Sequence, residues 1–285
     1  MKKFFYFFAA TVVLAVVGCS KDDATATDVK YVSEIKIGFE GDTRVTAVHS
    51  AAGLKFAWAD GDVVRVRPIS NINAVHEFTY NCSTESFVAT SVNGVLEVGK
   101  DYIAEFGNIF AVISETKATG TFIAAASDGF GEKYLPMVSE KFTATAETTF
   151  ATMHHIVGVV EVPVKADSGT LSLESIQLTN PYGSYYDGWA GAYDVDLSTN
   201  AITVKDSQGE TYKKSTFDPV KPIPTTVTSI FIPVLPMQDV DVLLQYKLAG
   251  KEYSWNVEFA GKKLTVERGK ITKISEVTLT NYLLM

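Results

Sequence analysis

The stretch VDVLLQYKLAGKEYSWNVEF, residues 240–259, decides the fold class. Apolar residues occupy every second position on both sides of the short segment 249–252 (AGKE). Because side chains alternate between the two faces of a strand, this pattern indicates a strand with one buried face. Two such runs across a glycine-containing turn predict a β-hairpin. The alternating residues are Val240, Val242, Leu244, Tyr246 and Leu248, followed by Tyr253, Trp255, Val257 and Phe259.

The period of two recurs in both halves of the chain. It is seen in residues 35–39 (IKIGF), in 171–178 (LSLESIQL) and in 191–204 (GAYDVDLSTNAITV). In the second run the phase slips at Glu174-Ser175, which predicts a β-bulge. Repeated short strands separated by turn residues are typical of sandwiches and barrels, so the sequence predicts an all-β protein.

Two further segments predict local structure, one a hairpin and the other a short helix. Residues 262–279 consist of an alternating run, a turn at 267–270 (ERGK) and a second alternating run, which predicts another hairpin. Residues 121–130 (TFIAAASDGF) favour a short helix that ends at Asp128-Gly129.

The N-terminus has the marks of a secretory signal. Lys2 and Lys3 are followed by an almost unbroken apolar run to Gly18, which is short for a membrane span of about 20 residues. Val16-Val17-Gly18-Cys19 resembles the bacterial lipobox, in which the cysteine is lipidated and becomes the mature N-terminus. The alternative is an ordinary cleaved signal with Cys19 nearby by chance.

Lipidation explains the need for a cysteine, because its thiol accepts the diacylglyceryl group as a thioether. More than one acyl chain is needed for stable anchoring. Ser20-Lys21-Asp22-Asp23 resembles the acidic export tag of surface lipoproteins in Bacteroidetes-type bacteria, and the same residues also fit a solvated tether. We expect a signal peptide at 1–18, a lipidated tether at 19–30, and an outer-membrane anchor that faces outward.

Composition excludes several classes of function. The chain has 285 residues and a formal charge of −8, which becomes −10 when Lys2 and Lys3 leave with the signal. An acidic chain without basic clusters argues against nucleic acid and against electrostatic binding to anionic lipid. Besides the lipid-bearing Cys19 the only cysteine is Cys82, and one remaining thiol cannot form an internal disulfide.

Motifs for catalysis or metal binding are not evident. The histidines are at positions 49, 76, 154 and 155 and lack the spacing of a metal site. The sequence has no Gly-rich phosphate loop and no GxSxG nucleophile elbow. We therefore expect a protein that is not an enzyme and needs no cofactor other than the covalent lipid on Cys19.

Residues 35–66 (IKIGFEGDTRVTAVHSAAGLKFAWADGDVVRV) resemble the opening of the fimbrillin-like proteins of Bacteroidetes-type bacteria. The shared features are a first strand, a Thr-Arg segment and a Trp-x-x-Gly-Asp turn before a strand. The resemblance returns in residues 176–180 (IQLTN) with 190–204 (AGAYDVDLSTNAITV), in 230–236 (IFIPVLP) and in 264–279, and so spans nearly the whole mature chain.

This resemblance implies two tandem transthyretin-like β-sandwiches, which we place at 31–156 and 157–285. It also implies a lipoprotein precursor of a pilus or a related surface adhesin. Assembly in the family works by strand addition: a protease cuts after an arginine and removes the first strand, and a neighbouring subunit fills the groove. The implied partners are other fimbrial subunits, or ligands on host or bacterial surfaces.

Arg44 follows the first strand, where such a cut would be useful, although a surface arginine in a loop fits equally well. Arg65 and Arg67 are poorer candidates because they lie in an expected strand. Beyond Leu279 only residues 280–285 remain, which is short for a donor strand; the apolar end YLLM is either the donated piece or part of the core. An anchor, tip or stand-alone adhesin role therefore stays open.

In the turn Trp58-Ala59-Asp60-Gly61-Asp62, Gly61 supplies a positive φ and the aspartates can cap turn amides. We expect Trp58 to pack into the core. The aspartates could instead bind calcium, but two carboxylates make a poor site.

Residues 181–194 (PYGSYYDGWAGAYD) form an aromatic stretch. Exposed rings on a loop stack on sugars or anchor a protein interface; the alternative, which we favour, is that they fold back onto the sandwich. A monomeric glycan-binding surface lipoprotein is thus the alternative function. The residues concerned are Tyr182, Tyr185, Tyr186, Trp189 and Tyr193.

Overall fold

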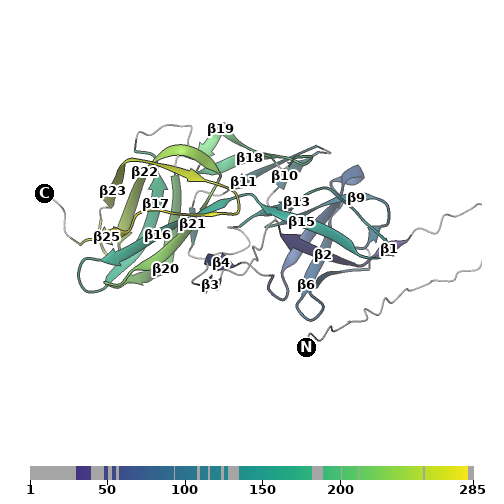
Figure 1. Ribbon diagram of the computed structural model, residues 1–285, viewed down its shortest axis with the longest axis horizontal. Coiled ribbons are helices and arrows are strands. Elements are labelled where there is room, and N and C mark those ends of the chain that lie inside the picture. The colour runs from purple at the N-terminus through teal and green to yellow at the C-terminus, as the bar shows by residue number, and fades with distance from the viewer. Residues whose placement is uncertain are drawn as a thin grey trace, which may run out of the picture.

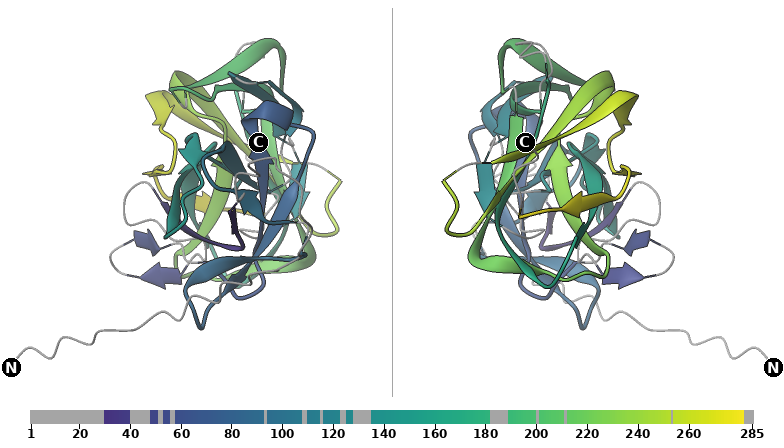
Figure 2. Two further views of the ribbon diagram at one scale, coloured as in Figure 1. Left: turned by 90° about the vertical axis from the view of Figure 1, so that its right-hand side faces the viewer. Right: turned by 90° about the vertical axis from the view of Figure 1, so that its left-hand side faces the viewer.

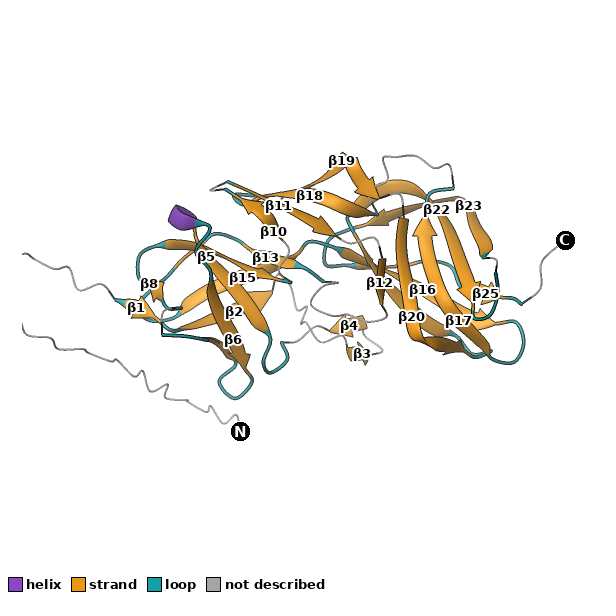
Figure 3. Ribbon diagram, turned by 180° about the vertical axis from the view of Figure 1, so that it is seen from behind, coloured by secondary structure: helices purple, strands orange, loops and turns teal. Residues whose placement is uncertain are grey.

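The computed structural model describes residues 30–39, 48–50, 53–55, 58–92, 94–107, 110–114, 116–122, 125–127, 135–181, 189–199, 201–210, 212–252 and 254–281. These residues form an all-β structure, drawn in Figures 1 and 3, and its one helical element is the short 3-10 helix η1 (Ile69–Asn71). Among the described residues no helix has the length and apolar character needed to cross a membrane.

The N-terminal strands form a sheet that closes on itself, which we call the barrel. Its last strand but one, β9, pairs with the first, β13, and so completes the ring. In order around the sheet the strands are β13 (Met137–Ser139), β15 (Thr149–His155), β2 (Glu34–Phe39), β7 (Ser86–Ala89), β6 (His76–Asn81), β5 (Val63–Pro68), β9 (Asp101–Phe106) and β14 (Phe142–Thr143).

Two small pairs accompany the barrel. Strand β1 (Tyr31–Val32) pairs antiparallel with β8 (Leu96–Glu97), and β3 (Val48–Ser50) pairs with β4 (Gly53–Lys55). The barrel core is apolar and rich in aromatic rings, which include Phe78, Phe87 and Phe106. Burial of these rings, at roughly 1.5–3 kcal/mol for each large apolar side chain, is the main force that holds the barrel.

The C-terminal strands form a sandwich of two sheets around a second core. One sheet runs β12 (Ala125–Ser127), β20 (Tyr212–Ile223), β17 (Leu171–Thr179), β22 (Met237–Leu248) and β23 (Trp255–Val266). The other has β16 (Gly158–Ala166) at its centre, with β21 (Thr228–Val234), β24 (Ile271–Lys273) and β25 (Val277–Leu279) beside it. The two panels of Figure 2 look along the long axis from the barrel end and from the sandwich end.

A third sheet lies between the barrel and the sandwich, as Figure 1 shows. Its order is β10 (Phe110–Ile113), β11 (Lys117–Phe122), β18 (Ala190–Asp196) and β19 (Ile202–Glu210). The core beneath it joins all three parts, because it contains Ile103 and Val138 of the barrel, Tyr193 of this sheet and Val159 of the sandwich. The barrel and the sandwich are thus packed against each other through the residues of this third core.

Several sequence predictions are confirmed. The hairpin of residues 240–259 is β22–β23, with Tyr246 opposite Trp255 and Gly250 at φ +74°. The phase slip in β17 is a register shift between Leu173 and Ser175 against both neighbouring strands. Residues 191–204 form strand, turn and strand as β18 and β19.

Two local predictions are wrong. Instead of a helix at 121–130, residues 121–122 end β11 and residues 125–127 form β12, which pairs parallel with β20. The alanines that favour a helix are overridden by this tertiary pairing. Residues 262–279 turn at Gly269, but β24 leaves β23 and pairs parallel with β16 in the opposite sheet.

The predicted boundary between residues 156 and 157 falls between β15 and β16. Strand pairs cross it in the middle of the molecule, since β11 pairs with β18 and β12 with β20. The division into 31–156 and 157–285 stays a prediction.

Candidate functional site

Strand β2 lies inside the barrel sheet, between β7 and β15. It runs antiparallel to β7, with Ile35 opposite Phe87, and parallel to β15, with Ile37 opposite Ala151. The alternation predicted from IKIGF is confirmed, because Ile35 and Ile37 are buried while Glu34 and Lys36 are exposed. The first strand of the barrel in chain order is therefore an interior strand of its sheet.

The position of β2 has a direct physical consequence. An interior strand satisfies the backbone groups of both neighbours, so its loss would expose two rows of unpaired N–H and C=O groups. It would also open the apolar positions now filled by Ile35 and Ile37. Such a groove selects a strand with apolar side chains at alternate positions.

Trp58 covers β2 from inside the barrel. Its indole Nε1 donates a hydrogen bond to the carbonyl oxygen of Ile37 at 3.2 Å, and its ring stacks on Phe39 with centroids 4.7 Å apart. Phe87 and Phe106 meet the same ring edge-on at 4.8 and 5.2 Å. The prediction that Trp58 packs into the core is confirmed.

The turn after Trp58 is held by its own aspartates. The Asp62 carboxylate accepts a hydrogen bond from the Ala59 amide at 2.7 Å, and that of Asp60 accepts one from the Cys82 amide at 3.0 Å. Gly61 adopts φ +89°, and its amide donates to the Tyr80 carbonyl. Partial burial raises the pKa of Asp62, and the bond from the Ala59 amide opposes that rise.

The amide-capping role of both aspartates is thus confirmed. Within the described residues, the structure brings no group of three or more His, Cys, Asp or Glu side chains together at metal-binding distance.

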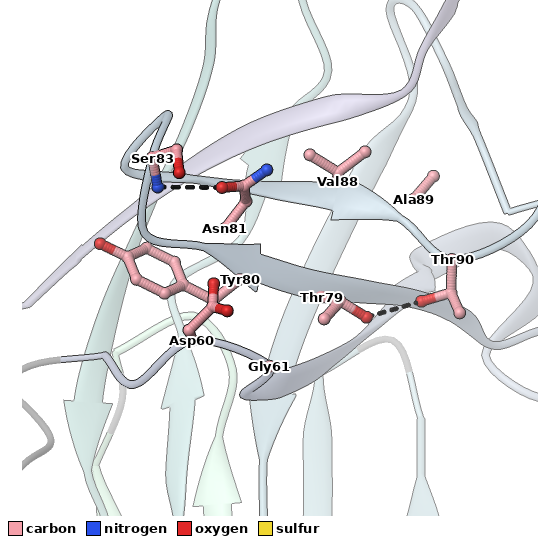
Figure 4. Close-up of a pocket in the computed structure, with 9 residues that line it drawn as sticks. All are labelled: Asp60, Gly61, Thr79, Tyr80, Asn81, Ser83, Val88, Ala89 and Thr90. Atoms are coloured by element: carbon pink, nitrogen blue, oxygen red, sulfur yellow. Dashed lines mark hydrogen bonds between the residues drawn. The ribbon is translucent and has the colours of Figure 1, made fainter.

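A polar hollow of about 390 Å³ lies beside this turn, on the hairpin β6–β7 (Figure 4). Asn81 Oδ1 accepts a hydrogen bond from the Ser83 amide at 2.9 Å, and the hydroxyls of Thr79 and Thr90 are 3.1 Å apart. Side chains that line the hollow include Asp60, Thr79, Asn81, Ser83, Val88 and Thr90.

Sequence reasoning missed this hollow. Thr79 and Asn81 lie at alternate positions of β6, and Val88 in β7 is followed at the next alternate position by Thr90, just beyond the strand. This is the pattern of any solvent-exposed sheet face. Only the pairing of β6 with β7 and the approach of the turn bring these residues together.

The aromatic stretch is described in part. Trp189 and Tyr193 are both 0% exposed, so neither ring is available to a ligand in this structure. Burial, with the negative charge of Glu105, raises the pKa of Tyr193. Tyr182, Tyr185 and Tyr186 lie outside the described residues, and so do Cys19 and Arg44.

The other arginine and histidine candidates lie in strands. Arg65 and Arg67 are both in β5, and Arg67 forms a partly buried ion pair with Glu105 at 2.7 Å. His154 and His155 end β15 and are both buried, with His154 Nε2 3.1 Å from Glu140 Oε1. Burial, then the charges of Arg268 and His154, lowers the pKa of His155 to about 4.

No protein-family model matches this chain, and no curated protein matches it significantly. Solved structures do match. A candidate cell adhesion protein from Bacteroides ovatus has a TM-score of 0.58 and 15% identity, over 88% of this chain and 94% of that chain. This similarity shows a shared fold.

Two other solved structures are more distant. A candidate cell adhesion protein from Bacteroides uniformis gives a TM-score of 0.49 at 13% identity, over 90% of this chain and 94% of that chain. A fimbrial protein from Bacteroides ovatus gives 0.36 at 11% identity, over 88% of this chain and 51% of that chain. At these TM-scores neither similarity establishes a common fold.

Proposed function

We propose that this chain is a surface lipoprotein that acts as a fimbrial subunit or an adhesin and assembles by strand addition at the position of β2. The observation that carries the proposal is that the first strand of the barrel in chain order is an interior strand, between β7 and β15. It is also the strand that a single cut on its C-terminal side would separate from the rest of the barrel.

The proposed cut is after Arg44, in the segment that follows β2. The groove left behind would offer the edges of β7 and β15 for backbone pairing, and the apolar positions of Ile35 and Ile37 for side chains. Backbone pairing supplies affinity, and the alternating pockets set the register of the incoming strand. The partner at this site is another fimbrial subunit.

The proposed anchor is a lipid on Cys19, which would hold the uncut chain at the outer membrane, facing outward, until the cut after Arg44 releases it. Labelling of cells with a radioactive fatty acid tests this step. Because the cut after Arg44 would remove Cys19, the labelling is done in the uncut Arg44→Ala chain. We expect that chain to be labelled and the same chain with Cys19→Ala to be unlabelled; an unlabelled Arg44→Ala chain would remove the anchor from the proposal.

Surface-extracted protein tests the strand addition. We expect an N-terminus at Val45, together with filaments or SDS-resistant oligomers in electron microscopy and unheated gels. Arg44→Ala should abolish both, whereas Arg65→Ala, in β5, should abolish neither. A mature start at Cys19 alone, with only monomer on the gel, would contradict the proposal.

A second candidate function is a monomeric surface lipoprotein that binds glycans. The hollow on β6–β7 favours it, because it gathers hydroxyl, amide and carboxylate groups on one exposed face. The Arg44→Ala variant distinguishes the two candidates. Strand addition requires the cut and would be lost in this variant, whereas glycan binding requires no cut and would be retained.

A further inference from the structure

We infer that the hollow beside the 58–62 turn is a subsite for one neutral sugar residue of a polysaccharide. The inference deepens the glycan-binding candidate and rests on it. It moves the contact from the aromatic stretch, where Trp189 and Tyr193 are buried, to the hairpin β6–β7 and the turn that packs on it.

The polar groups in the hollow match a sugar that presents neighbouring hydroxyls. The Asp60 carboxylate uses one oxygen for the Cys82 amide and retains acceptor capacity on the other. Asn81 uses its oxygen for the Ser83 amide, which orients its NH₂ group as a donor. The paired hydroxyls of Thr79 and Thr90 can both donate and accept.

Apolar contact is supplied between these groups. Val88 is 38% exposed in the lining of the hollow. The C–H face of a pyranose ring can pack on such a surface while its hydroxyls reach the polar rim. A site of this kind recognises both faces of a sugar ring, which a purely polar surface does not.

Size and charge exclude other ligand classes. A volume of about 390 Å³ lies at the small end of the range for small-molecule sites, about 300–1,000 Å³. Asp60 is the one charged side chain among the lining residues of this hollow, so a phosphate, sulfate or carboxylate ligand would meet repulsion and no cation. The exposure of Asp60, Asn81 and Thr90 suits a residue inside a longer chain.

The hollow is also pre-organised. Asp60 is held by the Cys82 amide, and the turn is fixed to β6 by hydrogen bonds between Gly61 N and Tyr80 O at 3.0 Å and between Tyr80 N and Asp62 O at 2.8 Å. Thr79 and Val88 are direct partners in the β6–β7 ladder. Groups that are fixed before binding lose little conformational entropy when the ligand arrives.

Native affinity electrophoresis tests the inference. The chain, with Arg44→Ala to keep it untrimmed, is run in gels that contain dextran, α-mannan, galactan or β-1,3-glucan as neutral probes, and polygalacturonate or heparin as anionic ones. We expect at least one neutral polysaccharide to retard the protein and the anionic ones not to. Retardation should weaken at least tenfold in Asp60→Asn and in Thr90→Val.

Control variants distinguish this site from a general effect of substitution and from the aromatic stretch. Asp60→Asn keeps an oxygen for the Cys82 amide, and circular dichroism verifies that each variant folds. Thr278→Val, the same change at an exposed position of β25, and Trp189→Phe, in the aromatic stretch, should bind like the parent.

Lack of retardation by every neutral probe would overturn the inference, as would undiminished retardation of the two hollow variants. Strand addition plays no part in this assay, so its failure would leave the result unchanged.

Discussion

Gly158 lies directly against the backbone of Glu267: a Cβ on Gly158 would be 2.3 Å from the Glu267 carbonyl oxygen and 2.4 Å from a methyl group of Val266. The same contact zone includes hydrogen bonds from Gly269 N to Val157 O and from Val159 N to Lys270 O, both at 2.9 Å. The backbone that connects β15 to β16 therefore packs directly against the backbone at the end of β23.

Gly158→Ala should lower the free energy of unfolding by about 2–3 kcal/mol, because the obstacle is backbone and cannot rotate away. Urea denaturation measures it. Gly38→Ala in β2 is the matched control: its Cβ would meet nothing within 4 Å, so stability should stay equal or rise by up to about 1 kcal/mol. Equal losses in the two variants would contradict the close contact.

Trp58→Phe should loosen β2 more than the rest of the molecule. The variant loses the hydrogen bond to the Ile37 carbonyl, which is worth about 1 kcal/mol, together with part of the ring contact with Phe39. Hydrogen exchange followed by mass spectrometry should show faster exchange in β2 and unchanged exchange in β17. Trp255→Phe, in the sandwich, should leave β2 exchange as it was; uniform acceleration in the Trp58 variant would refute the local role.

Two buried tyrosines should respond in opposite directions to loss of the hydroxyl. Within the described residues Tyr193 OH is buried without a hydrogen-bond partner, so Tyr193→Phe should raise stability by about 1 kcal/mol. Tyr102 OH accepts a hydrogen bond from the Glu97 amide at 2.8 Å, so Tyr102→Phe should lower it by about the same amount. Thermal denaturation measures both effects. If the melting temperatures of the two variants shifted in the same direction, the contrast between the two hydroxyl groups would be contradicted.

Acid should weaken the fold through His155. The pKa of His155 is about 4 in the folded chain, against an ordinary value of 6.5, so between these values the unfolded chain binds more protons. Stability from this group is complete above pH 6.5 and is lost as the pH falls. The expected loss between pH 7.5 and 5.5 is about 1 kcal/mol. Urea denaturation at the two pH values measures this loss. His155→Gln should not show the loss, whereas His76→Gln should show it in full. If the stability of His155→Gln fell with pH as steeply as that of the parent, His155 would not be its cause.

The sequence was informative wherever one strand carries its own pattern. Alternation identified β2, β17, β22 and β23, and the phase slip at Glu174-Ser175 identified the bulge. Trp58 and the aspartates of its turn were interpretable because turn chemistry is local.

What depends on pairing between distant segments was not accessible. The parallel partnership of β2 with β15 joins residues more than a hundred positions apart, and nothing in either strand marks the other. Residues 125–127 pair with β20 against their own helix preference, and β24 crosses to β16. The hollow could not be predicted for the same reason, because Asp60 meets Asn81 only after the turn has docked on β6.

The central claim, that β2 occupies a site a second copy can fill, is tested most directly with a disulfide between Gly38→Cys and Thr152→Cys. These residues face each other across β2 and β15, at a strand spacing of about 4.8 Å that a disulfide can bridge. Cys82→Ser removes the competing exposed thiol, and a specific protease site placed at residues 41–46 allows the cut. Size-exclusion chromatography of the cut protein is then the measurement. We predict monomer while the disulfide holds β2 in place, and oligomers after reduction. Oligomers that form equally with the disulfide intact, or a reduced and cut chain that stays a folded monomer, would contradict the account.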